Sequence, residues 1–282
     1  MESATRVKFV ETPKVWAVGM VRDEADVIEY TLRHLIASAV DGIVVADNLS
    51  TDGTRDIILN VRRQVRTPII LIDDTDPAYY QSAKMTALLQ IALRHADQEW
   101  PWIVPFDADE VLVCSYRVPF AKYLRSMPET RRCFSVPMVN YFPCYLDREH
   151  HNPFKRIVHR HVPLNTLPKV VFRGTAGITI QQGSHAVLDT DGSTLEATHS
   201  TMLKICHFPY RSAEHFVRKA INGGLAYQAA NLPESEGAHW RAYYAAFERG
   251  GEAALVDWYQ RYFHFKESRM DELVWDPAPI LE

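Results

Sequence analysis

Between residues 15 and 106, short apolar runs alternate with segments whose apolar side chains recur every three or four positions. The apolar runs are rich in β-branched residues and predict strands, whereas the spaced segments predict helices. Strands separated by helices in this way are typical of βαβ units, which build a mostly parallel sheet. The predicted strands are 15–21, 42–46, 68–72 and 102–106, and the predicted helices are 26–37, 52–64 and about 85–92.

Acidic residues follow three of these predicted strands. Asp47 follows the second strand, Asp73 and Asp74 follow the third, and Asp107 and Asp109 follow the fourth. Parallel sheets bind ligands at the carboxyl ends of their strands. We therefore expect these carboxylates to gather at one edge of the sheet.

The pattern changes after Pro119. Prolines, histidines and short β-like pieces dominate residues 133–205, with predicted strands at 134–139 and 177–181 and a turn at 189–192. Helices are predicted again at 213–230 and 238–249. No low-complexity linker and no internal repeat divides the chain, so we expect one domain over residues 1–282 with a variable second half.

Charge and hydropathy exclude several classes of protein. Lys and Arg total 31 and Asp and Glu total 35, which gives a net charge of −4. We expect no nucleic-acid partner, because a protein that coats a duplex needs a basic excess. No apolar run approaches the roughly 20 residues that span a bilayer. Residues 1–10 carry no apolar signal core and no small-residue cleavage site, so we expect a cytoplasmic protein.

The run Asp107-Ala108-Asp109 is the strongest candidate for a metal site. In a turn, both carboxylates can approach one cation, and carboxylate oxygens suit Mg²⁺ or Mn²⁺, which also bind phosphate oxygens. The alternative is a solvated acidic turn. The position of the run directly after an apolar strand favours the metal site.

Three segments together resemble family 2-type glycosyltransferases of the GT-A fold. They are Val21-Arg22-Asp23-Glu24, the turn from Asp47-Asn48 to Gly53-Thr54, and Phe106-Asp107-Ala108-Asp109-Glu110. The chain resembles in particular a subgroup that also looks like family 92 enzymes, which carry a late His-Phe/Tyr, an Arg-Ser and a helix with Lys. The corresponding residues here are His207-Phe208, Arg211-Ser212 and Lys219.

The resemblance covers about residues 15–224 and implies an α/β fold with a mostly parallel central sheet flanked by helices. It also implies a nucleotide-sugar-binding half at about 13–118, an acceptor and catalytic half at about 119–230, and a C-terminal helical extension at about 231–282. One departure matters, because Asn48 stands where many relatives have a second Asp and supplies no charge.

The resemblance also implies roles for single residues near the metal and the nucleoside. Asp109 is the expected principal metal ligand, Asp107 touches ribose or a metal-bound water, and His207 reaches the metal or the diphosphate. Asp47 is expected to recognise the base. Glu24 is expected near the ribose, which Arg22 also has the chemistry to bind; helix N-terminal acids that favour the helix dipole are the alternative reading of this segment.

Four basic residues are further candidates for contact with the donor. The resemblance places Lys84 against the nucleotide and Lys155 against the donor or acceptor. Lys155, Arg211 and Lys219 have the charge to stabilise a departing diphosphate.

An inverting transfer needs a carboxylate that deprotonates the acceptor hydroxyl. Asp147, Glu149 and Glu110 are the candidates, and spacing does not choose among them. Asp147 and Glu149 are equally compatible with an exposed polar loop. Glu110 adjoins the metal motif.

The sequence thus predicts a metal-dependent, inverting glycosyltransferase that uses Mn²⁺ or Mg²⁺. The expected donor is a UDP-sugar, and the expected acceptor is a hydroxyl of a glycan or glycolipid in bacterial surface polysaccharide or lipopolysaccharide synthesis. A nucleotidyltransferase is the first alternative, although the segment 18–22 has only one glycine where such enzymes carry a Gly-rich loop. A non-catalytic nucleotide- or carbohydrate-binding module is the second.

Cysteines and histidines suggest a second kind of site, which we do not expect. The four cysteines, Cys114, Cys133, Cys144 and Cys206, form no Cys-x-x-Cys pair, so they are predicted to be buried free thiols. Seven of the 12 histidines fall between residues 150 and 207. His159 and His161 are at strand spacing, yet no His-Glu-x-x-His pattern points to zinc. His185 is expected to line the acceptor pocket.

Aromatic and basic residues mix in the stretch 258–266. Such a stretch can rest on the inner face of a membrane as a peripheral contact. It can also pack on the core or on a partner subunit of a homo-oligomer. We expect packing rather than membrane contact.

Overall fold

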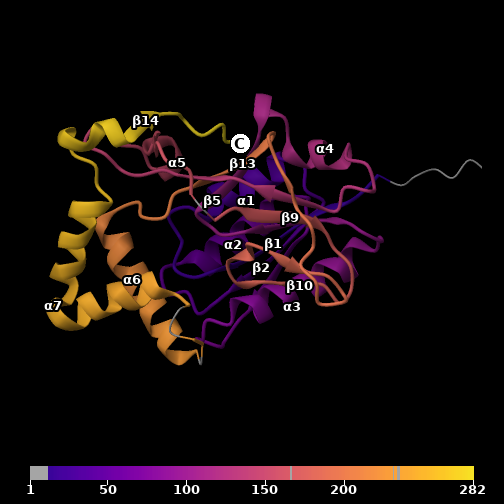
Figure 1. Ribbon diagram of the computed structural model, residues 1–282, viewed down its shortest axis with the longest axis horizontal. Coiled ribbons are helices and arrows are strands. Elements are labelled where there is room, and N and C mark those ends of the chain that lie inside the picture. The colour runs from indigo at the N-terminus through magenta and orange to yellow at the C-terminus, as the bar shows by residue number, and fades with distance from the viewer. Residues whose placement is uncertain (1–11, 166, 231, 234–235) are drawn as a thin grey trace, which may run out of the picture.

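The computed structural model describes residues 12–165, 167–230, 232–233 and 236–282. Residues 1–10, where no signal segment is expected, lie outside them. A seven-stranded sheet with the order β12-β6-β9-β4-β1-β2-β3 forms the centre (Figure 1). Its strands are β1 (Val15–Val21), β2 (Gly42–Asp47), β3 (Ile69–Asp73), β4 (Trp102–Phe106), β6 (Cys133–Val136), β9 (Lys169–Arg173) and β12 (Thr198–His199).

The four strands predicted from the first half are parallel to one another in this sheet. β1 lies between β2 and β4, and β3 pairs with the outer side of β2. β9 runs antiparallel to both β4 and β6. The predicted α/β class, with a mostly parallel central sheet flanked by helices, is therefore confirmed.

Alternation along β1 distributes apolar side chains to both faces of the sheet, as strand geometry requires. Val15, Ala17 and Val21 belong to one buried core, and Trp16 and Val18 to another. The first core includes residues of α1 (Ile28–Ala37), α2 (Thr54–Gln64) and α4 (Phe120–Arg125), and the second includes those of α3 (Gln81–Ala96). Both faces are thus covered by helices, which keeps a parallel sheet out of water.

A smaller three-stranded sheet carries part of the site described below. It contains β5 (Glu110–Cys114), β13 (Leu203–His207) and β7 (Met138–Asn140), in that order. β13 pairs on both sides, and His207 stands opposite Glu110 on one neighbour and opposite Asn140 on the other.

One sequence prediction is wrong in this region. The single strand expected over 134–139 is two strands, β6 and β7, which belong to different sheets. Pro137 separates them. Proline has no N–H to donate to a ladder, so a strand that meets one inside a sheet ends or changes partners.

The strand expected over 177–181 is reduced to the two residues of β10 (Thr179–Ile180). Apart from two C-terminal helices, the remaining elements are short. These elements are the pairs β8 (His159–His161) with β14 (Leu273–Trp275) and β10 (Thr179–Ile180) with β11 (Val187–Leu188), the helix α5 (Pro153–Arg156), and the 3₁₀ turns η1 (Ser115–Arg117), η2 (Gln182–Ser184) and η3 (Glu267–Glu272).

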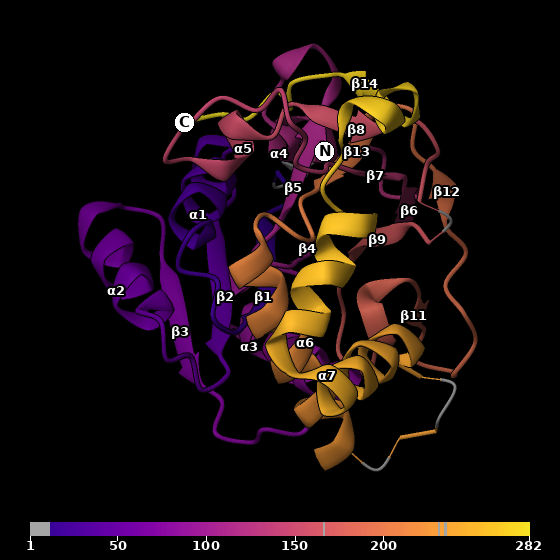
Figure 2. The same ribbon diagram turned by 90° about the vertical axis from the view of Figure 1, so that its left-hand side faces the viewer.

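Helices α6 (Ala213–Ala229) and α7 (Ala238–Tyr262) pack against each other beside the sheet (Figure 2). Gly223 permits their close approach, because a Cβ there would lie 2.6 Å from Trp240 Cε3. The helix predicted at 238–249 continues past Gly251, whose φ of 64° bends it.

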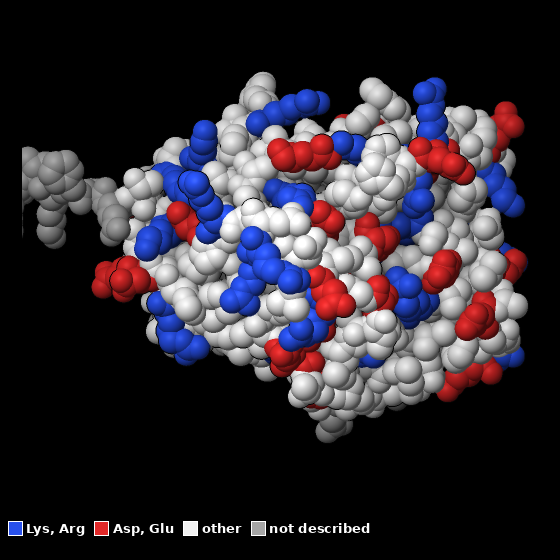
Figure 3. Space-filling model, turned by 180° about the vertical axis from the view of Figure 1, so that it is seen from behind, with Lys and Arg blue, Asp and Glu red and all other residues white. Residues whose placement is uncertain are grey.

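The aromatic stretch at 258–266 packs into a third buried core, as expected. Tyr259 and Phe265 are buried there with Phe216 of α6 and Tyr243 of α7. Among the described residues, no helix has both the length and the apolar character that crossing a bilayer requires. Lys and Arg intermingle with Asp and Glu on the face opposite to that of Figure 1 (Figure 3).

Candidate active site

A cavity of about 590 Å³ opens at the carboxyl ends of β1, β2 and β4. This is the edge where a parallel sheet binds ligands. Side chains from the loop after β1, the β4–β5 loop, the ends of β9 and β13, and helix α6 converge on it. Its charged lining residues are Arg22, Asp23, Glu24, Asp107, Asp109, Glu110, Lys169, Arg218 and Lys219, with the histidines His185, His207 and His239.

The turn after β2 holds the loop after β1 in place. Asp23 N donates to Ser50 Oγ at 2.9 Å, and Glu24 N donates to Thr54 Oγ1 at 2.8 Å. Asp52 accepts from Ala25 N at 3.1 Å. Asp52 thus ties the turn to the loop after β1, and the same turn fixes where the Glu24 carboxylate lies.

Arg211 lies beneath the cavity and gathers three acidic groups from two segments. Its guanidinium is fully buried, donates to Glu24 Oε2, and lies 2.7 Å from each oxygen of Asp26. It also approaches Asp109 Oδ2 at 3.8 Å and His215 Nε2 at 2.8 Å. Arg211 does not line the cavity, so it positions these acids rather than facing a ligand directly.

Burial alone would raise the pKa of Glu24, but the positive charges of Arg211 and Lys219 outweigh it, and the pKa lies below its usual value. The pKa of Asp109 is also held well below its usual range. Burial opposes this shift, and Lys219 and His207 cause it. Both groups are therefore carboxylates at neutral pH.

Lys219, on α6, bridges two acidic elements of the site. Its Nζ donates to Asp109 Oδ2 and lies 3.1 Å from Glu24 Oε1. Burial lowers the pKa of Lys219, yet Asp109 and Glu24 raise it above the usual value. The side chain stays charged and occupies the position next to Asp109 where another cation would compete with it.

Lys169, on β9, bridges a second pair of acids. Its Nζ lies 2.6 Å from Asp107 Oδ2 and 2.6 Å from Glu110 Oε2. Burial raises the pKa of Glu110, Lys169 opposes that shift, Asp107 adds to it, and the pKa reaches about 7. The strand that carries Lys169 received no role from the sequence, although this lysine is the buried counter-charge of the acidic loop.

His207 is oriented by a hydrogen bond. Its Nδ1 donates to Asn140 Oδ1 at 2.8 Å, so Nε2 carries the free lone pair of the neutral ring. Nε2 lies 3.7 Å from Asp109 Oδ2. An imidazole nitrogen fixed in this way next to a carboxylate oxygen is a common arrangement for metal ligation.

Asp109 and His207 fit a divalent cation that takes its remaining ligands from a diphosphate and water. A carboxylate with an imidazole suits Mn²⁺ better than Mg²⁺, which prefers oxygen ligands alone. Asp107 points its Oδ2 at Lys169 instead. The structure thus brings Asp109 and His207 together, and Lys219 has to leave Asp109 Oδ2 before a metal binds there.

The surroundings differ among three residues that were expected to contact the nucleotide: Arg22, Asp47 and Lys84. Arg22 lines the cavity. Asp47 lies outside its lining, buried beside the lining residue Asn48, and Asp47 Oδ1 has no hydrogen-bond partner among the described residues. Lys84 also lies outside the lining and forms an ion pair with Asp74 at 2.7 Å.

Three candidates from the acceptor half lie outside the cavity lining: Asp147, Glu149 and Lys155. Lys155 pairs with Glu282 at 2.5 Å. Glu149 is exposed, and Asp147 contacts Cys144 instead. Of the three base candidates, Glu110 is the one that lines the cavity. His185, which was expected at the acceptor pocket, lines the same cavity.

The sequence reasoning missed an aromatic wall and a polar helix face. The wall comes from Tyr79, Phe142, Tyr210, Tyr227, Trp240, Tyr243 and Phe263. The helix face comes from positions 218, 219, 222, 223, 226 and 227 of α6. These positions are spaced as one face of a helix, so the polar members of that face were a readable signal.

No protein-family model matches the chain, and no curated protein matches its sequence. Solved structures of similar fold include residues 1–349 of S. aureus TarS, at 12% identity and a TM-score of 0.40, covering 84% of this chain and 72% of that one. The same TarS fragment in complex with UDP has 14% identity and a TM-score of 0.38, covering 83% and 70%. The mannosyltransferase PcManGT from Pyrobaculum calidifontis, in complex with GDP-Man and Mn²⁺, has 17% identity and a TM-score of 0.43, covering 90% and 76%.

Proposed function

We propose that the chain is a metal-dependent, inverting glycosyltransferase of the family 2 type. It would transfer a sugar from a nucleotide-diphosphate donor, a UDP-sugar by preference, to a hydroxyl of a glycan or glycolipid, in bacterial surface polysaccharide or lipopolysaccharide assembly. The observation that supports this proposal most directly is the cavity itself. It combines the pair Asp109 and His207 with four cationic side chains and an aromatic wall, at the ligand-binding edge of a parallel sheet.

The cations have the position that departure of a diphosphate requires. Arg22, Lys169, Arg218 and Lys219 all line the cavity. Groups fixed before the reaction stabilise developing negative charge most efficiently. Mn²⁺ held by Asp109 and His207 would supply Lewis-acid neutralisation of the diphosphate. Lys219, displaced from Asp109, is then free to contact a donor phosphate.

Glu110 is our choice for the base that accepts the proton of the acceptor hydroxyl. It lines the cavity, whereas Asp147 and Glu149 do not. The ammonium of Lys169 fixes its carboxylate, and Glu110 begins β5, whose ladder holds it opposite His207. A base held on the rigid sheet meets the requirement for a fixed distance to the acceptor.

Two further features support binding of a nucleotide base and of a sugar ring. At the end of β2, Asp47 offers a buried acceptor oxygen that has no hydrogen-bond partner among the described residues, and an N–H of a base would satisfy it. Sugar rings bind by placing their apolar faces on aromatic rings, and the wall formed by Tyr227, Trp240 and Tyr243 offers such faces.

The test is release of UDP from a panel of UDP-sugars with and without Mn²⁺. Asp109→Asn should reduce turnover by about 10² or more, the typical effect of removing one stabilising group in an active site. Asp191→Asn is the matched control, because Asp191 lies in the exposed turn at 189–192. Proton NMR of the product should show inversion at the anomeric carbon.

Two results would overturn the proposal. Pyrophosphate release from nucleoside triphosphates, without UDP release from any UDP-sugar, would identify a nucleotidyltransferase. Equal turnover of the Asp109→Asn and Asp191→Asn proteins would show that the acidic loop takes no part in the reaction.

Glu110→Gln should lower kcat by about 10²–10⁴ with little change in the affinity for donor, whereas Glu149→Gln should retain activity.

A further inference from the structure

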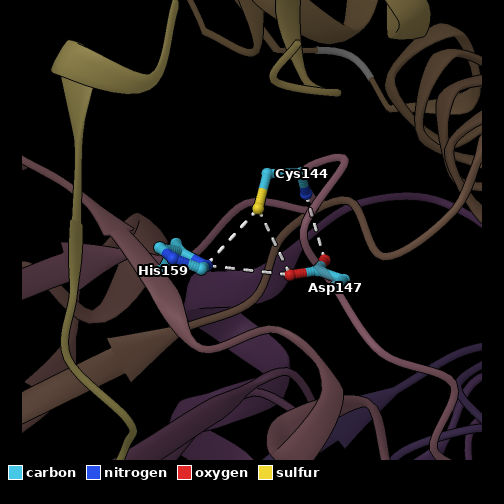
Figure 4. A group of neighbouring side chains, drawn as sticks. All are labelled: Cys144, Asp147 and His159. Atoms are coloured by element: carbon cyan, nitrogen blue, oxygen red, sulfur yellow. Dashed lines mark hydrogen bonds and ion pairs between the residues drawn. The ribbon is translucent and has the colours of Figure 1, made fainter. Parts of the chain in front are cut away.

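A second group of potential metal ligands lies outside the cavity lining. Cys144 and Asp147 belong to the loop that follows β7, and His159 begins β8. Figure 4 shows the three side chains pointing toward one another. Cys144 and His159 are buried, and the Asp147 side chain is only 9% exposed. The proposed function uses none of them.

The distances among the three ligand atoms describe one face of a tetrahedron. Cys144 Sγ lies 3.3 Å from His159 Nδ1 and 3.4 Å from Asp147 Oδ1, and the last two atoms are 3.8 Å apart. Zinc binds sulfur at about 2.3 Å and nitrogen or oxygen at about 2.0–2.1 Å. Tetrahedral angles then separate sulfur from either light atom by about 3.6 Å, and nitrogen from oxygen by about 3.4 Å.

The arrangement does not fit a catalytic relay. A relay joins its nucleophile and its acid to the two different nitrogens of the histidine ring. Here Cys144 and Asp147 both face Nδ1 of His159. Three lone-pair atoms therefore point at one position, as metal ligands do.

Only weak hydrogen bonds of the thiol link this group. The thiol can donate its proton to Asp147 Oδ1 while its sulfur accepts one from His159 Nδ1. At 3.8 Å, Asp147 Oδ1 and His159 Nδ1 are too far apart for a hydrogen bond. Among the described residues, no Lys or Arg forms an ion pair with Asp147. A cation at the centre would satisfy all three atoms.

The loop also has the backbone form of a metal-binding turn. Asp147 N donates to Cys144 O at 3.1 Å, and Cys144 N donates to Asp147 Oδ2 at 3.0 Å. The pattern is Cys-x-x-Asp, which matches the usual Cys-x-x-Cys spacing of zinc sites with a carboxylate in the second position. A search for cysteine pairs overlooks it.

A fourth ligand is at hand in the C-terminal segment. Cys144 forms a β-bridge with Phe265, and Tyr145 N donates to Phe265 O at 3.1 Å. His264, the residue before Phe265, has a buried Nδ1 with no hydrogen-bond partner among the described residues. His264 thus offers a nitrogen ligand within a segment that is already tied to Cys144.

We propose that Cys144, Asp147 and His159 bind one Zn²⁺, with His264 as the fourth ligand. The thiolate selects a borderline-soft ion such as Zn²⁺ and disfavours Mn²⁺ and Mg²⁺. The site joins the loop after β7 to β8 and to the end of α7. Phe142 and Phe263 of the cavity wall flank these segments, so zinc holds that wall in place.

The test uses the full chain, freed of metal by a chelator and titrated with Co²⁺. We expect one equivalent of Co²⁺ to give the visible bands of a tetrahedral ion and the near-ultraviolet band of a thiolate bound to cobalt. Cys144→Ser should abolish the thiolate band. Cys133→Ser should keep it, because Cys133 is an equally buried free thiol far from the three ligands in the main sheet. Zn²⁺ should displace Co²⁺.

Absence of the thiolate band in the wild-type protein, or its persistence in Cys144→Ser, would overturn the proposal. If Cys144→Ser does not fold, Asp147→Asn decides. Its Co²⁺ affinity should fall by more than the roughly 10–100-fold that loss of an outer-shell partner costs, and an unchanged affinity would refute the site. Asp109→Asn should keep the band, so the two proposed metal sites fail independently.

Discussion

Among the residues that the structure describes, two groups of three potential metal ligands differ in what stands at their centre. Glu24, Asp26 and His215 form one group, in which each ligand atom lies within 4.8 Å of the others. Cys144, Asp147 and His159 form the other, under the same limit. Arg211 donates to both carboxylates of the first group. No Lys or Arg forms an ion pair with the second, among the residues that the structure describes.

The difference shows that ligand chemistry alone does not make a metal site. A guanidinium supplies five donors in a fixed fork and satisfies buried carboxylates as a metal would. Arg211 takes that position permanently, because its own burial is compensated by Glu24 and Asp26. The second group contains a thiol and a histidine, for which zinc is the suitable cation.

Arg211→Met would break the first group and should have the largest effect. It leaves Glu24 and Asp109 buried without their guanidinium partner, which costs about 3–5 kcal/mol. Urea unfolding measures the loss. Arg55→Met is the control, because the exposed pair of Arg55 with Asp73 contributes about 1 kcal/mol or less. Equal losses in the two variants would contradict the central position of Arg211.

Removal of zinc would test the second group, and its effect is again a change in the free energy of unfolding. A metal that binds the folded state alone stabilises it by about 2.7 kcal/mol when its free concentration is 100 times its Kd. Thermal unfolding should therefore shift upward with added Zn²⁺ and downward with a chelator. The Cys144→Ser protein should not respond to either. A response of the same size in that variant would place the zinc elsewhere.

Acid should weaken the first group, because Glu24 stabilises the fold as a carboxylate. Glu24 has a pKa below its ordinary value of 4.5 in the folded protein. Its contribution to stability is therefore complete above pH 4.5 and is lost as the pH falls toward the lower folded value. The expected slope is at most about 1.4 kcal/mol per pH unit for this one proton. Urea unfolding between pH 5 and pH 3 measures it, and Arg211→Met should flatten the curve.

Lys219→Met tests whether a cationic side chain also competes with a metal at Asp109, and we expect it to have the smallest effect. Its ammonium competes with a metal for Asp109 Oδ2, so its removal should tighten Mn²⁺ binding by about fivefold, or ~1 kcal/mol. Calorimetric titration of Mn²⁺ measures the change. Turnover should fall in the same variant, since a donor phosphate loses a cation. Weaker Mn²⁺ binding would show that Lys219 supports the metal instead of opposing it.

The first half of the fold was readable because its pattern is local. The limits of β1 and β4 follow from runs of buried residues that end at an acidic loop or at a polar turn. The acidic loop could be placed at the ligand-binding edge for the same reason. The break at Pro137 could also be foreseen in principle, since proline interrupts a ladder. The change of sheet at that residue depends on distant strands and could not.

The counter-charges of the site were harder to predict, because they come from far along the chain. Lys169 reaches Asp107 across 62 positions, and Lys219 reaches Asp109 across 110. Nothing in the local sequence marks Lys169 as a buried residue of a strand end. The Cys144, Asp147 and His159 group was overlooked for a different reason. Its spacing contains one cysteine where the familiar pattern has two.

The pairing of β13 with both β5 and β7 has a consequence for how the site can move. Glu110, His207 and Asn140 stand side by side on three adjacent strands, and neighbouring strands are about 4.8 Å apart. A loop that closes over a bound donor can shift by several ångströms, but the spacing of these three residues cannot change unless the ladder itself opens. Glu110 and His207, which we propose as base and metal ligand, would thus keep a fixed separation while substrates bind.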